Sequence, residues 1–524
     1  MKGKVKLMLA MMIAISCSEK RVDPDLDTDL HYGRNLSHEK IVLGARLENP
    51  YKTENITKAL ETLYPTKADR VEVRTTDLYV RFLPGDEAQY DALTDMGLIL
   101  TDHPLDFEIL QEGDWYHDPE IPDDKVTWQY AVVPSDFDFP DMEYEIIDEC
   151  HITENMAGTR SDDGIDWEEV ERQSYLLTGN GNMLSPQTRA QKVAPSGRIT
   201  IIDGAKDGGK PVGVKGVRIS CNSFVKFSHC HTDSEGYYSM DRKYSSDIRY
   251  RMVFENSQGF TIGFNMILVP ASVSTLGTAD ASGINMTVTS DSESKLFKRC
   301  VVNNAAYDYF QRCSSDDLGI TRPSSNLRIW LFHRMKEGGS VMMHQGAVLD
   351  DELISGFLGD FAPLIKIFLP DIVLGLRNKE DFRTIFTDTC HELAHASHFE
   401  KVGTTYWNNY LQYVFRSYLT SGIMDYGSGS GDYAGNCEVA ESWSYYLSSK
   451  LAYERYGGTY SSLGTTFWFR PQVLRYVEEC GISSGDIYSV LDDDVDSIDA
   501  LQRALIAGNP AKSRELEQIF NRYK

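Results

Sequence analysis

The feature that most constrains this chain is the segment Cys390-His391-Glu392-Leu393-Ala394-His395, which contains the pattern HExxH. On a helix, positions i and i+4 lie on the same face, so His391 and His395 can both bind one Zn²⁺. Glu392 can then reach a water held by the metal, whose pKa falls toward neutrality, and take its proton as the water attacks a carbonyl. The pattern predicts a zinc site with Glu392 as general base. The alternative is an ordinary helix that happens to carry two histidines.

The residues around the motif favour a helix packed against a second one. Apolar residues precede and follow the histidines at helical spacing, and Asn378 is a candidate cap with Asp381 three residues later. Small residues beside the ligands, Ala394 among them, allow another backbone to come close. His398 lies about 10 Å along the axis from His391, so one straight helix cannot bring it to the same ion. We interpret His398 as a packing or supporting residue.

A catalytic zinc normally has three protein ligands, and residues 435–447 offer the third. This segment reads as a helix capped by Asn436, with a stripe of small residues interrupted by one carboxylate, Glu441. We expect Glu441 to be the third metal ligand and Glu438, one turn earlier, to hydrogen-bond a ligand histidine. The reverse assignment stays open. So does the possibility that both are solvated helix carboxylates, the usual fate of glutamate.

His391, Glu392 and His395, followed by a glutamate on a later helix, resemble the gluzincin-type zinc metallopeptidases of the zincin superfamily. The resemblance covers the motif helix and the glutamate helix, which lie in the last two-fifths of the chain. It departs from the family in the long gap before Glu441 and in lacking an Asn-Glu-x-x-x-Asp string. It implies peptide-bond hydrolysis and a tyrosine or histidine that stabilises the oxyanion, for which Tyr426 and Tyr433 are the nearest candidates.

The first 17 residues predict export. Three lysines precede a short apolar run at residues 7–15, which ends before Cys17. This arrangement resembles a bacterial lipoprotein signal, in which Cys17 would be lipid-modified; an ordinary secretory signal is the alternative. Residues 18–50 would then be a polar tether. We expect an outer-membrane or surface lipoprotein of the bacterial envelope, held at the membrane only by its lipid.

Length and charge bound the remaining organisation. A chain of 524 residues, 41% hydrophobic and 25% charged, is long enough for three or four folded domains. The net charge of −26 argues against a nucleic-acid partner. Residues 51–160 mix strand and helix patterns, including strands at 71–74 and 78–83 and a helix at 87–96. This N-terminal domain is either a scaffold or a substrate-binding accessory surface, and the polar residues 161–195 read as a connector.

Residues 196–290 alternate strands with Gly, Pro and Asp turns, which is typical of an antiparallel β-sandwich. They resemble the carboxypeptidase regulatory-like (prealbumin-like) domain, whose implied role is structural or adhesive. Residues 291–524 are mostly helical and form the predicted peptidase domain. Its patterns indicate a helix at 296–313, strands at 327–332 and 364–368, a helix at 407–419, and closing helices at 472–479, 498–507 and 514–523.

The predicted class is therefore a multidomain α+β protein with an N-terminal mixed domain, a β-sandwich and a helical zincin domain with a small sheet. An exported chain permits disulfides, and three pairings are conceivable: Cys221–Cys230, Cys300–Cys313 and Cys390–Cys437. Buried free thiols are the alternative. The expected function is zinc-dependent hydrolysis of a peptide or protein. The rivals are a surface binding lipoprotein with an inactive zincin domain, and a zinc hydrolase of a non-peptide amide.

Overall fold

The computed structural model describes residues 40–66, 71–122, 125–155, 164–184, 192–263, 271–291, 294–332, 341–342, 371–376, 379–421, 426–458 and 467–523. The predicted signal with Cys17, residues 18–39 and the predicted strand at 364–368 lie outside these ranges. None of the helices in the described ranges is long and apolar enough to cross a membrane. Helical and sheet-forming segments are both extensive, which confirms the α+β class at this coarse level.

The N-terminal region contains two small antiparallel sheets, in which β2 lies between β4 and β5 while β1 pairs with β3. Residues 71–74 form no strand, in contrast to the prediction. Asp86 caps α4 by accepting a hydrogen bond from the Gln89 backbone N–H. The elements here are β1 (Val42–Arg46), α3 (Thr53–Leu63), β2 (Asp77–Leu83), α4 (Glu87–Asp95), β3 (Phe107–Gln111), β4 (Gln129–Pro134) and β5 (Glu143–Cys150).

Two segments predicted to be linkers belong to the folded body. Strand β1 falls within the predicted tether, and the neighbouring Ile41 is buried. The predicted connector contains α5 (Trp167–Leu177), which Asp166 caps and which buries Val170 and Tyr175 completely. The polar sequence misled the prediction because α5 buries only one face, against α3, and leaves the other in water.

Residues 196–288 form two sheets whose apolar side chains share one core, Ile199 and Ile201 from one sheet and Ile219 and Tyr250 from the other. The first sheet has the order β10-β6-β14, with β7 also paired to β6; the second contains β8, β9, β11, β12 and β13. Their bounds are β6 (Ser196–Ile202), β7 (Pro211–Gly213), β8 (Val217–Ser223), β9 (Lys226–His231), β10 (Tyr237–Ser239), β11 (Ile248–Asn256), β12 (Thr261–Gly263), β13 (Val273–Ala279) and β14 (Met286–Val288).

The second sheet continues across the expected boundary at residues 290 and 291. Strand β12 pairs in parallel with β15 (Arg328–Phe332), which pairs in parallel with β17 (Ile372–Gly375). The short β16 (Val341–Met342) runs antiparallel to β17 and ends the strand order. Helix α6 (Ser294–Ser314) packs against both sheets and against α9 (Phe382–Ser421). The β region and the helical region therefore share one sheet and one hydrophobic core.

The C-terminal region is built around two long helices, α9 (Phe382–Ser421) and α10 (Ala434–Tyr456), with smaller helices against them. Gly403, at φ 73° and ψ −178°, breaks α9 into two halves. These dihedrals are essentially accessible only to glycine. The predicted helix at 407–419 is the second half. The closing helices are α11 (Gln472–Glu479), α12 (Ser484–Ser489), α13 (Ile498–Gly508) and α14 (Ser513–Asn521).

Both predicted helix caps require correction. Asp381, not Asn378, caps α9: its carboxylate accepts from the Thr384 N–H at 2.9 Å, and Asn378 lies outside the described ranges. Helix α10 begins at Ala434, directly after Tyr433 in the left-handed conformation, so Asn436 lies inside the helix. All eight cysteines from Cys150 to Cys480 are free thiols, so none of the three conceivable disulfides forms.

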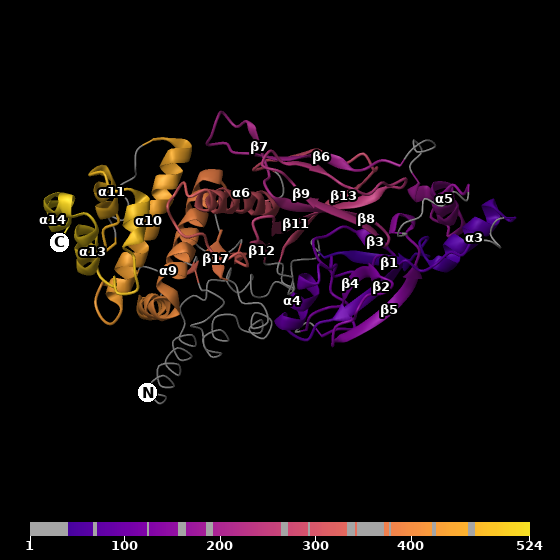
Figure 1. Ribbon diagram of the computed structural model, residues 1–524, viewed down its shortest axis with the longest axis horizontal. Helices are drawn as coiled ribbons and strands as arrows, with labels where there is room; N and C mark the ends of the chain where they lie inside the picture. Colours follow the sequence, from indigo (N-terminus) through magenta and orange to yellow (C-terminus); the bar gives the residue numbers. More distant parts are fainter. Residues whose placement is uncertain are drawn as a thin grey trace, which may run out of the picture.

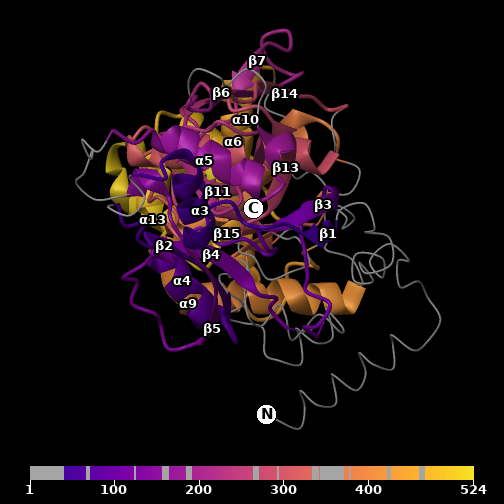
Figure 2. The ribbon, with the colours of Figure 1, turned by 90° about the vertical axis from the view of Figure 1, so that its right-hand side faces the viewer.

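The described elements are arranged along one axis, with the C-terminal helices at one end, the two-sheet region in the middle and α3 and α5 at the other end (Figure 1). Figure 2 looks from the α3 and α5 end, with the two-sheet region behind these helices. Helix α4 lies beside the shared sheet, near β12 (Figure 1).

Candidate metal centre

The first half of α9 brings the two motif histidines together. Their rings lie 4.7 Å apart between centroids, and the two Nε2 atoms are 3.1 Å apart. On the other side of the helix, Cys390 and Leu393 are buried in the core. The apolar stripe thus fixes the rotation of the helix and directs the histidines toward α10.

Helix α10 supplies the carboxylate that the sequence predicted. Glu441 places Oε2 at 3.3 Å from His391 Nε2 and Oε1 at 3.5 Å from His395 Nε2. The helices come this close because small residues face each other, with Ala394 and Ala440 fully buried. Trp443 fixes the contact by donating its Nε1–H to the Ala394 carbonyl oxygen at 3.3 Å.

The three donor groups fit a tetrahedral metal ion. Bonds of about 2.0–2.1 Å at tetrahedral angles place neighbouring donor atoms about 3.3–3.4 Å apart. The two Nε2 atoms are 3.1 Å apart, and each lies 3.3 or 3.5 Å from one of the two Glu441 oxygens, so all three distances are close to this value. Two histidines and one carboxylate are also a donor set typical of catalytic zinc. Within the described part of the chain, His391, His395 and Glu441 are the one His/Cys/Asp/Glu group close enough to hold an ion.

Two hydroxyl groups orient these donors. Ser444 Oγ lies 2.9 Å from His395 Nδ1, so that nitrogen can carry the ring proton and leave the Nε2 lone pair directed at the site. Tyr410, from the second half of α9, donates its hydroxyl to Glu441 Oε1 at 2.7 Å. The break at Gly403 returns the second half of α9 toward the first, and the Tyr410 ring lies 5.5 Å from that of His395.

Burial and mutual charge set the protonation of the three donors. Burial would raise the pKa of Glu441, but the two imidazoles outweigh it and hold that pKa well below its usual range. Burial would lower the pKa of His391, but the contact with Glu441 and its charge raise it above the ordinary value. For His395 burial prevails, and the pKa is lowered. The group is therefore a carboxylate beside at least one neutral imidazole.

Glu392 lies on the same side of α9 as the donors but is not one of them. Its side chain is buried, and its Oε2 atom has no hydrogen-bond partner. Burial, together with the charges of Glu441 and Asp388, raises the pKa of Glu392 to about 8 despite the opposing effect of His391. A nearby cation would lower this pKa, because it favours the charged form. The group can thus exchange a proton near neutral pH.

Access to the centre runs past His391. Its side chain is 12% exposed, whereas those of His395 and Glu441 are only 1% and 2% exposed. The ring of Tyr445 packs edge-on against His391 at 4.4 Å, and its hydroxyl lies 3.2 Å from that of Tyr426. Tyr445 and Tyr426 therefore form the polar wall beside the accessible imidazole.

Other predicted site residues lie elsewhere. The Glu438 carboxylate accepts from the Ile498 backbone N–H at 3.4 Å, at the start of α13. The expected hydrogen bond from Glu438 to a ligand histidine is not formed. Tyr433 precedes α10 and is 39% exposed. His398 is fully buried, its ring packs against Tyr406 and Trp407, and neither of its nitrogens has a hydrogen-bond partner.

Sequence reasoning missed Tyr410 and Tyr445. Tyr445 lies one helical turn after Glu441, a spacing that the sequence displays and that could have selected it. The position of Tyr410 depends on the break of α9 at Gly403, for which the sequence offered only the glycine itself.

Trp407 links the centre to the sheet, since its Nε1–H donates to the Met342 carbonyl oxygen of β16 at 3.1 Å.

Comparison with models of known protein families, with curated proteins and with solved structures found no match to this chain.

Proposed function

We propose that the protein is a zinc-dependent peptidase with its centre at His391, His395 and Glu441. The observation that supports this most is the convergence of three buried donor groups at separations suited to one tetrahedral ion. A zinc ion bound there would act as a Lewis acid and would lower the pKa of a coordinated water toward neutrality.

In this proposal Glu392 is the general base. It is buried beside the donors with one free oxygen atom, and its pKa is raised by burial into the range where it can take a proton and return it. The carboxylate would accept a proton from the attacking water and deliver it to the departing amine. Ser444 and Tyr410 would keep His395 and Glu441 in place during the reaction.

Tyr445 and Tyr426 are the proposed oxyanion-stabilising pair. Tyr445 is nearest to the accessible His391, and Tyr426 supports it through their shared hydrogen bond. Burial raises the pKa of both phenols, so each keeps the proton that it would donate to a developing negative charge. An extended peptide could approach along β16, which ends the strand order and touches α9 through Trp407.

The substitution Glu392→Gln tests the mechanism. The amide keeps the shape and all three donors but cannot take a proton, so peptide cleavage should fall by about 10²- to 10⁴-fold while zinc content stays the same. Cleavage of a mixed peptide library by zinc-loaded protein, with and without chelator, measures this. Glu400→Gln, at an exposed position of the same helix, is the control and should keep full activity.

The same assay separates the rivals. A parent protein that binds zinc but cleaves no peptide would support an inactive centre in a surface binding protein. Cleavage of simple amides without cleavage of peptides would support a non-peptide amide hydrolase. Unchanged peptide cleavage by Glu392→Gln would show that the assigned base is wrong.

A further inference from the structure

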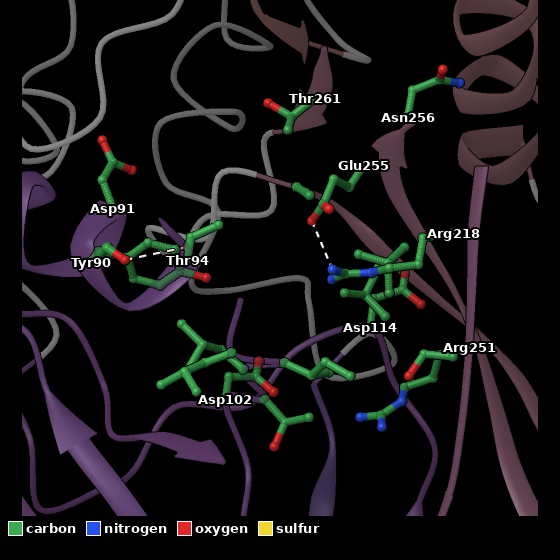
Figure 3. Close-up of a pocket in the computed structure, with 18 of the residues that line it drawn as sticks. Tyr90, Asp91, Thr94, Asp102, Asp114, Arg218, Arg251, Glu255, Asn256 and Thr261 are labelled. Atoms are coloured by element: carbon green, nitrogen blue, oxygen red, sulfur yellow. Dashed lines mark hydrogen bonds and ion pairs between the residues drawn. The ribbon is translucent and has the colours of Figure 1, made fainter. Parts of the chain in front are cut away.

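A cavity beside the shared sheet is lined by residues other than those of the metal centre. Its volume is about 340 Å³, and residues of both the N-terminal region and the β region line it. Figure 3 shows Arg218 and Arg251 of strands β8 and β11 on one side, and Tyr90, Asp91 and Thr94 of α4 on the opposite side. This volume is within the range of small-molecule sites, about 300–1,000 Å³.

The notable group in this cavity is the guanidinium of Arg251, which is only 5% exposed. Its nitrogens reach Asn222 Oδ1 at 2.8 Å and His103 Nε2 at 3.4 Å, and its Nε atom has no hydrogen-bond partner. Burial, with the charges of Arg249 and Arg251, lowers the pKa of His103 well below its usual range, so that ring is neutral. Among the described residues, no carboxylate forms an ion pair with Arg251.

The other arginines in and beside the cavity are paired within the protein, whereas Asp95 and Asp102 of the lining form no ion pair among the described residues. Three carboxylates of the lining each pair with an arginine, at 2.8, 3.1 and 3.0 Å: Glu255 with Arg218, Asp91 with Arg328, and Asp114 with Arg299. The neighbouring Arg249 pairs with Glu112 at 2.7 Å. Arg251 is therefore the arginine of this group that forms no ion pair among the described residues, although the carboxyl group of Asp102, which also lines the cavity, attracts it electrostatically. A buried charge without a contacting partner is unfavourable.

Polar groups near Arg251 add donors and acceptors. The Ser220 side chain is 2% exposed, and its hydroxyl has no hydrogen-bond partner. Asp102 accepts from the Tyr116 N–H at 2.6 Å, and burial raises the pKa of Asp102 to about 6. A ligand in this cavity would thus meet a cation and a hydroxyl on the β8 and β11 side and a weakly acidic carboxyl group at Asp102.

We propose that this cavity binds a small organic carboxylate, with Arg251 as its counter-ion and Ser220 as a hydrogen-bond partner. Guanidinium groups recognise carboxylates by parallel charge-assisted hydrogen bonds, and the volume leaves room for more than an inorganic anion. Two sources share this chemistry, the C-terminus of a short peptide and an acidic sugar. This site is separate from the proposed peptidase centre and does not depend on it.

Isothermal titration of the full chain with two matched ligand pairs tests the proposal. The pairs are alanyl-alanine with its C-terminal amide, and glucuronate with glucose. In at least one pair the carboxylate should bind about tenfold more tightly or better than its neutral counterpart. The pair that responds distinguishes the peptide source from the sugar source.

Variants assign the preference to the cavity. Arg251→Met keeps the apolar stem and removes the charge, so the difference between carboxylate and neutral ligand should disappear. Arg198→Met removes an arginine from the other sheet and should leave the preference unchanged. Ser220→Ala should weaken carboxylate binding severalfold, and it provides the test if Arg251→Met fails to fold by circular dichroism. Two results would overturn the proposal. One is equal binding of the carboxylate and the neutral ligand in both pairs. The other is an unchanged preference for the carboxylate in Arg251→Met or, where that variant does not fold, in Ser220→Ala.

Discussion

Two polar clusters of this protein differ in how their charges are balanced. Between the N-terminal and β regions, the ammonium groups of Lys192 and Lys226 contact the carboxylates of Glu154 and Glu171 at 2.6–3.5 Å. Lys226 is completely buried, yet two positive and two negative charges compensate one another. In the centre between α9 and α10, the only ionisable cations that contact Glu441 among the described residues are instead the two histidines, and the neutral Tyr410 hydroxyl is its third partner.

The difference indicates which cluster is structural and which needs a further component. The lysine–glutamate cluster is neutral as it stands, so it can serve only to join the regions around it. The group of His391, His395 and Glu441 is balanced only by an added cation, either a proton on an imidazole or a metal ion. Preformed donors oriented by Ser444 and Tyr410 are suited to the metal ion.

The largest expected effect concerns the packing that brings the donors together. Trp443→Ala removes a completely buried side chain and its hydrogen bond to Ala394, so the free energy of unfolding should fall by about 3–5 kcal/mol. Urea denaturation measures this. Leu177→Ala, at a half-exposed position of α5, should cost far less. A loss below about 1 kcal/mol for Trp443→Ala would mean that other contacts hold α9 against α10.

The next effect concerns the orientation of one donor. Tyr410→Phe removes the hydroxyl that donates to Glu441 Oε1, and loss of such a partner should weaken zinc binding about 10- to 100-fold. Competition against a chromophoric chelator measures the affinity. Tyr406→Phe is the control, because that hydroxyl reaches only the carbonyl oxygens of Asn436 and Val495. An equal loss of zinc affinity in both variants would show that the Tyr410 hydroxyl has no particular role in orienting Glu441.

The smallest effect belongs to the self-balanced cluster and appears as a pH dependence. Burial would raise the pKa of Glu154, but Lys226 and Lys192 lower it from 4.5 to about 2. A carboxyl group with a lowered pKa stabilises the fold above its unfolded-state value and loses that contribution as the pH falls through the folded-state value. The free energy of unfolding should therefore decline between about pH 4.5 and pH 2.

Glu154→Gln should flatten this decline, and Glu120→Gln, at an exposed position, should leave it unchanged. Thermal unfolding at several pH values measures both. If the parent and Glu154→Gln show the same slope, the cluster does not contribute to acid stability.

Local patterns in the sequence predicted the parts of the centre that local structure builds. Helical spacing placed His391 and His395 together, and a stripe of small residues selected Glu441, because side chains one turn apart share a face. The same logic predicted α6, β15, and both halves of α9. These elements depend mainly on residues close together in the chain.

Parts that depend on distant residues could not be predicted in this way. The pairing of β12 with β15 joins two regions through a parallel contact that no periodicity encodes. Helix α5 appeared to be a linker because its buried face is narrow. The roles of Glu438 and Glu441 could be distinguished only from the position of α13, whose first residue hydrogen-bonds to Glu438. The Arg251 cavity also requires the N-terminal region to be set against the sheet.

The proposed metal centre is tested most directly by comparing the zinc affinities of two variants of α10. Glu441→Gln removes a proposed metal ligand, whereas Glu438→Gln changes a similar carboxylate one turn away that contacts Ile498. We predict that the parent binds one zinc ion per chain and that Glu441→Gln lowers the zinc affinity by more than about 100-fold. This loss would exceed the one expected when only a residue that supports a ligand is removed. Glu438→Gln should bind zinc as the parent does. Unimpaired zinc binding by Glu441→Gln would contradict the proposed centre.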